Sequence, residues 1–156
     1  MIAVDTQIIV YQFLPGENSE LTEKLLLLDS DWFSSPLWRY EFRNVLAQYL
    51  RRKLVTSESA IRIAESAETF MKNKEIQIPP TKVVELINRT RCTAYDLEFV
   101  AVAEELGTKL ITTDKEILKE FPNVAISIKD FVKENAPQWV MDLSRSGGRV
   151  CQTGGA

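Results

Sequence analysis

This 156-residue sequence contains no histidine at all. Without an imidazole, Ser-His-Asp and Cys-His catalysis are excluded, and so are zinc sites with histidine ligands. A metal ion in this protein would have to be held mainly by oxygen atoms, which are the ligands that Mg²⁺ and Mn²⁺ prefer.

Cysteine and long apolar runs are also scarce. Cys92 and Cys151 are the only cysteines, they form no Cys-x-x-Cys pair, and we expect neither to be reactive. No apolar run approaches the ~20 residues of a membrane-spanning helix, and the N-terminus lacks the basic and apolar segments of a signal peptide. We therefore expect no membrane association and, by default, a cytoplasmic location.

Positive charge is not in excess either. The formal net charge is −3 and the pI is about 5.2, which argues against broad, non-specific binding of nucleic acid. A nuclease with a local basic rim remains open, because a cluster of catalytic acids itself lowers the pI. Hydrophobic residues make up 45% and charged residues 26%, as in ordinary globular domains.

Strand patterns and helix patterns alternate along the chain. The predicted strands cover residues 2–5, 31–35, 109–112 and 124–128. The predicted helices cover residues 6–13, 21–28, 38–53, 57–72, 81–91, 94–106, 115–121 and a short segment from 131. This alternation predicts an α/β fold with a parallel sheet and helices on both faces.

The helices at 38–53 and 57–72 predict a helical hairpin. The buried face of the second helix is predicted to contain Ile61, Ala64, Ala67 and Met71. The hairpin carries more apolar surface than one sheet layer needs, because Tyr40, Leu50 and Leu54 extend beyond its main stripe. A homodimer through this region is one expectation, and ordinary packing on the sheet is the alternative.

The composition changes after Pro137, where glycine and serine become frequent. The predicted domain therefore covers residues 1–136, and residues 137–156 are expected to form a loose tail. The length of the chain fits a single domain.

Four acidic residues stand where predicted elements begin or end. Asp5 and Asp114 each follow a strand, whereas Glu41 and Asp96 lie in the first turns of helices. In an open parallel sheet, ligands bind at the carboxyl ends of the strands, and these four positions can converge there. Carboxylates that close together repel one another unless a divalent cation neutralises them. The pattern predicts a Mg²⁺ or Mn²⁺ site.

Each acid also has a purely structural explanation, which is the better one when the acid is taken singly. Asp5 and Asp114 fit helix N-caps, Asp96 fits a capping box, and Glu41 would favour the helix dipole. Asp96 favours a metal-binding site, because it shares a helix face with apolar residues such as Phe99. An unpaired carboxylate in that setting needs a cation or hydrogen-bond donors.

The sequence around the acids reads Asp-Thr at 5–6, Tyr-Glu-Phe-Arg-Asn at 40–44, Thr-Ala-Tyr-Asp at 93–96 and Thr-Thr-Asp-Lys at 112–115. In this order, these segments resemble the PIN-domain ribonucleases, and most of all the VapC toxins of prokaryotic toxin–antitoxin pairs. The resemblance covers residues 1 to about 132.

The resemblance implies a three-layer α/β/α sandwich and a metal-dependent endoribonuclease that leaves a 5′-phosphate and a 3′-hydroxyl. The catalytic and metal-binding positions of the family fall on Asp5, Glu41, Asp96 and Asp114. Thr112 matches a supporting hydrogen-bonding residue, and Thr6 matches a small hydroxyl residue after the first acid. Gln7 stands where the family often has a serine. A cognate antitoxin and, often, a homodimer are also implied.

RNA would need cations beside such an acidic site. Arg39 and Arg43 flank Glu41 in the sequence, and Lys115 follows Asp114, so these three are the candidates for an RNA-binding rim. The alternative for each is a solvated surface charge.

Three other functions remain open. A housekeeping RNA-processing nuclease cannot be separated from a toxin on this sequence. A binding domain without activity is also compatible with the fold. A receiver-type phosphoacceptor fits less well, because Asp5 has no acidic neighbour and Lys129 matches the required lysine only loosely.

Overall fold

The computed structural model describes residues 1–16 and 18–143. In chain order the elements are β1 (Ile2–Val4), α1 (Thr6–Phe13), α2 (Ser19–Leu28), β2 (Trp32–Phe33), α3 (Trp38–Arg51), α4 (Ser57–Phe70), α5 (Pro80–Ile87), α6 (Ala94–Leu106), β3 (Leu110–Thr112), α7 (Lys115–Glu120), β4 (Ala125–Ser127), α8 (Ile128–Asn135) and α9 (Gln138–Asp142). Within the described ranges, every helix is too short or too polar to cross a bilayer.

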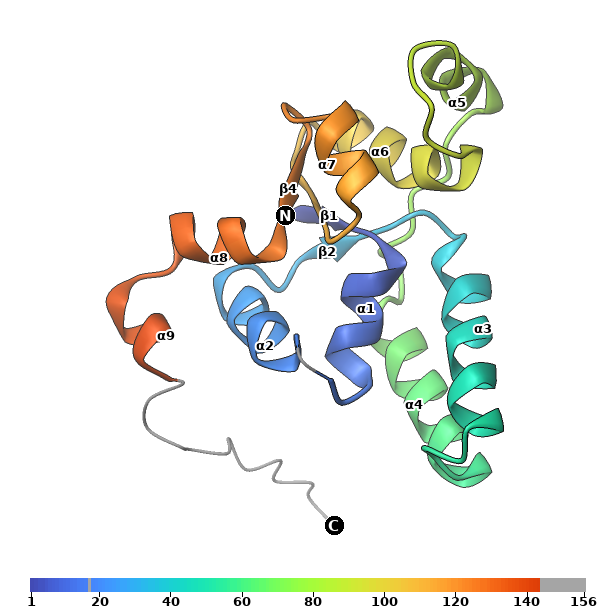
Figure 1. The fold of residues 1–156 in the computed structure, drawn as a ribbon, viewed down its shortest axis with the longest axis vertical. Helices are drawn as coiled ribbons and strands as arrows, with labels where there is room; N and C mark the ends of the chain where they lie inside the picture. Colours follow the sequence, from blue (N-terminus) through green and yellow to red (C-terminus); the bar gives the residue numbers. More distant parts are fainter. Residues whose placement is uncertain (17, 144–156) are drawn as a thin grey trace.

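The four strands form one parallel sheet in the order β2-β1-β3-β4. Figure 1 shows α5 and α6 on one side of this sheet and α1, α2 and α8 on the other. The predicted α/β fold with a central parallel sheet between helical layers is confirmed. Because β1 and β3 are neighbours, with Val4 opposite Ile111, the segments that follow these two strands begin side by side.

The two central strands, β1 and β3, are short but completely enclosed. Every residue of β1 and β3 is buried, which is usual for parallel strands covered on both faces. Helix α6 packs on both strands, and Gly107 ends it in the left-handed conformation at φ 61°. The centre of the sheet is therefore a rigid base for whatever follows β1 and β3.

The hairpin of α3 and α4 is joined to the sheet by aromatic contacts. The Phe13 ring of α1 meets Phe42 of α3 and Phe70 of α4 edge-on, with centroids 6.4 and 5.7 Å apart. Phe70 in turn contacts Trp32 of β2 at 5.3 Å, and Trp38 packs on Phe42. Edge-to-face pairs of this kind stabilise beyond their buried area. They set the position of α3, which carries Glu41.

Two predicted details are wrong. Of the four residues predicted for the buried face of the helix at 57–72, only Ile61 is exposed, at 59%, whereas Ala67 and Met71 are buried and Ala64 is half-buried. Ala60, seven residues before Ala67 and on the same side of α4, is buried in place of Ile61. The last predicted helix begins at Ile128 rather than at residue 131, because the Ser127 hydroxyl caps it by accepting from the backbone of Asp130.

The chain also continues as ordered structure past the predicted domain boundary at residue 136. Helix α9 packs against α2, and its Val140 side chain is completely buried. The predicted loose tail therefore does not start at residue 137. Its remainder, residues 144–156, lies outside the described residues.

Candidate functional site

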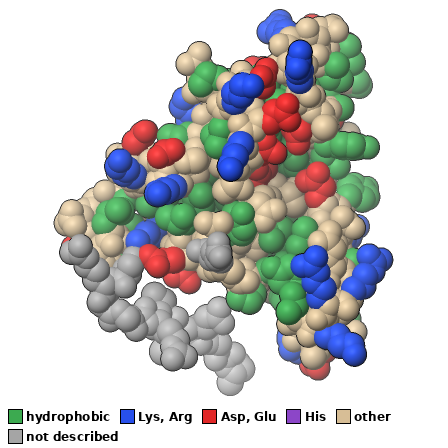
Figure 2. Space-filling view, in the orientation of Figure 1, with side chains coloured by type: hydrophobic (Ala, Val, Ile, Leu, Met, Phe, Trp, Pro, Cys, Tyr) green, Lys and Arg blue, Asp and Glu red, His purple; other side chains and the backbone are tan. Residues whose placement is uncertain are grey.

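A cleft of about 870 Å³ opens where β1 and β3 end. Its lining includes the four predicted acids together with Glu116. Asp5 and Asp114 come from the two strand ends, Glu41 from the first turn of α3 and Asp96 from the first turn of α6. Figure 2 shows acidic side chains gathered in the upper middle of this face, with lysine and arginine side chains nearby.

Asp5 is the most enclosed of these acids, with only 7% of its surface exposed. It caps α1, where its Oδ1 accepts from the backbone N–H of Ile8 at 3.0 Å, and its Oδ2 accepts from the Thr112 hydroxyl. Burial raises the pKa of Asp5 to about 6, although these hydrogen bonds lower it and nearby Asp114 raises it further. The charged form of Asp5 is therefore under-compensated by the protein alone.

Thr112 links the two strand ends. Its side chain is fully buried, and its hydroxyl donates to Asp5 while accepting from the backbone N–H of Asp114 at 2.9 Å. This arrangement holds the Asp5 carboxylate in one orientation beside the start of α7. Thr112 is the residue for which the family resemblance implies a supporting hydrogen bond.

Glu41 is held by the other predicted supporting residue. The Thr6 hydroxyl, at the start of α1, donates to Oε2 of Glu41 on α3. This hydrogen bond ties the first turns of two helices together at the floor of the cleft. Oε1 of Glu41 has no hydrogen bond within the part of the chain that the structure describes.

Asp96 and Asp114 both cap helices, and each does so with a single oxygen. Oδ2 of Asp96 accepts from the backbone N–H and the hydroxyl of Thr93, at 3.0 and 2.7 Å. Oδ1 of Asp114 accepts from the backbone N–H groups of Glu116 and Ile117, at 2.7 and 3.1 Å. The second oxygen of each carboxylate makes no hydrogen bond to the described residues and remains available in the cleft.

Asp96 combines the two roles that the sequence left open. It forms a complete capping box with Thr93, and its half-buried carboxylate also lines the cleft. Capping and a place in the cleft are compatible, because one oxygen serves each purpose.

The donor set suits a hard divalent cation. No three acidic or cysteine side chains among residues 1–16 and 18–143 are gathered closely enough to hold an ion by themselves. Mg²⁺ does not need such a cage, because it usually keeps several waters and takes one or two carboxylates from the protein. None of the four predicted acids forms an ion pair with a described lysine or arginine. Their negative charge is left for a ligand to balance.

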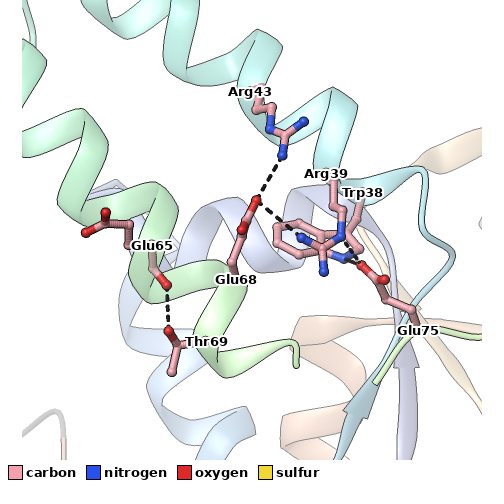
Figure 3. A network of polar contacts seen from close by, with 7 residues as sticks. All are labelled: Trp38, Arg39, Arg43, Glu65, Glu68, Thr69 and Glu75. Atoms are coloured by element: carbon pink, nitrogen blue, oxygen red, sulfur yellow. Dashed lines mark hydrogen bonds and ion pairs between the residues drawn. The ribbon is translucent and has the colours of Figure 1, made fainter. Parts of the chain in front are cut away.

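Two of the three predicted rim cations lie elsewhere. Arg39 pairs with Glu75 and Glu68, and Arg43 pairs with Glu68, so both face α4 rather than the cleft (Figure 3). Residues two apart on a helix point in nearly opposite directions, so neighbours of Glu41 at this spacing cannot share its face. Lys115 is exposed and lines the cleft as predicted.

Sequence reasoning missed several cleft residues. Tyr11, Asn44 and Glu116 line the cleft, and Gln7 was noted only as a departure from the family pattern. A usable signal was present, because Asn44 stands three residues after Glu41 and Tyr11 four residues after Gln7. Such spacings place side chains on the same face of a helix.

The comparison with protein families agrees with this architecture. The family model of the PIN domain matches residues 2–124, so this chain belongs to the PIN domain family. The family resemblance found in the sequence is confirmed.

One curated relative is Ribonuclease VapC3 of Pyrobaculum aerophilum, which is 28% identical over 124 residues, or 78% of this chain and 95% of the relative.

Solved structures share the fold at low identity. PAE2754 from Pyrobaculum aerophilum superposes with a TM-score of 0.68 at 23% identity, covering 86% of this chain and 88% of the other. FitAcB from Neisseria gonorrhoeae superposes with a TM-score of 0.66 at 16% identity, covering 83% of this chain and 99% of the other. FitAB bound to an IR36 DNA fragment superposes with a TM-score of 0.62 at 18% identity, covering 82% of this chain and 95% of the other.

Proposed function

We propose that this protein is a metal-dependent endoribonuclease and the toxin of a toxin–antitoxin pair. The observation that carries the proposal is the set of four carboxylates, without cationic partners among the described residues, around one cleft of a PIN domain. RNA as the substrate is supported by the similarity to Ribonuclease VapC3.

The acids would hold Mg²⁺ or Mn²⁺, with Asp5, Glu41 and Asp96 as its ligands, directly or through water, and Asp114 completing the site. When bound, such an ion would supply the positive charge that offsets the scissile phosphate and lowers the pKa of a water nucleophile. Thr112 fixes the orientation of Asp5, and Thr6 fixes that of Glu41. With no histidine in the chain, the proton goes to a carboxylate or to solvent.

Lys115 is the cation we assign to the RNA rim. It lies in the cleft lining beside Asp114 and forms no ion pair with the described residues, so its ammonium group is available to a phosphate. Arg39 and Arg43 are excluded from this role, because Glu68 and Glu75 already pair with them.

A protein antitoxin is the partner that the resemblance to VapC toxins implies. A homodimer is the second proposed assembly, through the hairpin of α3 and α4, where Tyr40, Leu54 and Ile61 are more than half exposed. Light scattering at micromolar concentration tests the dimer, and a monomeric mass would contradict it.

Cleavage of total RNA in the presence of Mn²⁺ tests the nuclease. The matched variant is Asp96→Asn, because asparagine keeps an oxygen for the Thr93 capping contacts while it loses the negative charge. We expect the wild-type protein to cleave RNA, and we expect EDTA or Asp96→Asn to stop cleavage. In EDTA, the thermal unfolding of Asp96→Asn should match that of the wild type. Full activity in either case would contradict the metal mechanism, and an inactive wild-type protein would favour a binding domain.

A further inference from the structure

The two walls of the cleft differ in chemistry. One wall comes from α6 and from the segment that enters α7, and it presents Asp96, Asp114, Lys115 and Glu116. The other comes from α1 and α3, and beyond Glu41 it presents the uncharged side chains Gln7, Tyr11, Asn44 and Val45. No lysine or arginine lines this second wall. The second wall therefore offers no cation to a phosphate, and its amides and aromatic side chain suit a neutral polar group.

The polar side chains of this wall are not engaged within the protein. The Gln7 and Asn44 amides and the Tyr11 hydroxyl make no hydrogen bond to any described residue. Gln7 and Asn44 are exposed, and Tyr11 is half-buried with its side chain packed against the core. Two amides, each with a donor and an acceptor, and one aromatic side chain thus line the same hollow.

The helix geometry places this wall directly beside the acids. Asn44 lies about one helical turn beyond Glu41, and Tyr11 about one turn beyond Gln7. The hydrogen bond from Thr6 to Glu41 joins the starts of α1 and α3 at the floor of the cleft. From that junction the uncharged wall extends away from the carboxylates, along two helices that pack against each other.

We propose that this wall is a nucleobase subsite, which holds the base next to the scissile phosphate of a single-stranded RNA. Tyr11 stacks on the base, and the Asn44 and Gln7 amides bond to its edge. Single-stranded RNA is recognised in this manner, by aromatic stacking and by hydrogen bonds to the edges of unstacked bases. The subsite rests on the proposed nuclease function and adds a determinant of cleavage position to it.

The test uses a short single-stranded RNA with a mapped cleavage site, in which each base around that site is replaced in turn by an abasic ribose. The variants are Gln7→Ala and Asn44→Ala. The matched control is Gln48→Ala, an exposed glutamine one turn beyond Asn44 that does not line the cleft. Thermal unfolding of all three variants shows whether the fold is retained.

We expect the wild-type protein to lose about tenfold in kcat/KM when one base beside the cleaved bond is removed, as for the loss of one stacked and hydrogen-bonded base. Asn44→Ala should show a smaller loss in kcat/KM on intact RNA, because it removes only one of the contacts to the base. On that abasic RNA, Asn44→Ala and the wild type should have the same kcat/KM. Gln48→Ala should behave as the wild type on every substrate.

Two results would overturn the subsite while leaving the nuclease intact. One is an active wild-type protein whose Gln7→Ala and Asn44→Ala variants match Gln48→Ala throughout. The other is a loss in Asn44→Ala that is equally large on intact and abasic RNA, because the side chain would then act without the base. A wild-type protein that cleaves no RNA would instead remove the proposed function, and the subsite with it.

Discussion

Helix α3 lies between two acidic clusters, only one of which is paired with arginines. On the side that faces α4, Glu68 and Glu75 are paired with Arg39 and Arg43, at distances from 2.6 to 3.2 Å (Figure 3). On the opposite side, Glu41 joins the acids of the cleft, where the described residues provide no ion pair. The same helix thus stabilises one cluster with its own arginines and leaves the other without a cation.

The difference separates structural acids from the acids that we propose to be functional. Oε1 of Glu75 accepts hydrogen bonds from Trp38 Nε1 and from Arg39 Nε, both at 2.6 Å. The hydrogen bond with Arg39 raises the pKa of the Arg39 guanidinium. The charge of Glu75 is satisfied within the fold. Asp5 is buried beside Asp114 with a pKa that burial raises, so its hydrogen bonds only partly compensate its charge. Breaking each cluster should therefore have opposite consequences for activity and stability.

The largest effect is expected from Asp5→Asn. Cleavage should fall on the order of a hundredfold or more, because residues that merely support metal ligands already cost 10–100-fold. The free energy of unfolding at pH 7 should not fall, since the substitution removes a buried charge. RNA cleavage and urea unfolding measure the two quantities. The control is Glu68→Gln in the paired cluster, which should keep its activity, and equal losses in both variants would erase the distinction.

The pH dependence of stability should also identify Asp5. Its pKa rises from 3.8 to about 6 on folding, so between these values the folded protein holds a proton that the unfolded chain has released. The free energy of unfolding contributed by Asp5 should therefore fall as pH rises from about 4 to about 7, by roughly 2–3 kcal/mol without metal. The measurement is urea unfolding in EDTA across this pH range. At each pH, the free energy of unfolding of Asp5→Asn is subtracted from that of the wild type. A flat difference would contradict the raised pKa, and Mg²⁺ should reduce the loss at pH 7.

A smaller effect is expected in the paired cluster from Glu75→Gln. The substitution weakens two charge-assisted hydrogen bonds at a half-buried site, so stability should fall by about 1–2 kcal/mol. Activity should fall only modestly, through looser positioning of the first turn of α3. Thermal unfolding and RNA cleavage measure the two changes. A loss of activity as large as that of Asp5→Asn would place Glu75 within the functional cluster.

The smallest effect is expected from Arg43→Ala. The Arg43 side chain is 57% exposed, and its pair with Glu68 is a surface ion pair, which contributes about 0.2–1 kcal/mol. RNA affinity, measured by fluorescence anisotropy, should not change, because Arg43 faces away from the cleft. Lys115→Ala is the matched comparison and should weaken RNA binding. Weaker binding in Arg43→Ala as well would restore the original rim prediction.

Much of the fold and of the cleft could be predicted because the relevant signals are local. Asp5 and Asp114 are marked by the strands that precede them, and parallel pairing of β1 with β3 brings them together without further information. The Thr93–Asp96 capping box is equally visible in the sequence. The exposure of Ile61 and the burial of Val140 were missed, because both depend on partners distant in the chain.

The sequence by itself determined which chemistry is available: oxygen ligands, no histidine, and acids at the ends of strands and the starts of helices. The tertiary structure decided which charges meet. Arg39, Glu41 and Arg43 lie within five residues of sequence, but the packing of α3 between α1 and α4 directs the arginines to Glu68 and Glu75, and Glu41 to Thr6. Electrostatic interactions depend on distance in space, and only the packed helices set that distance.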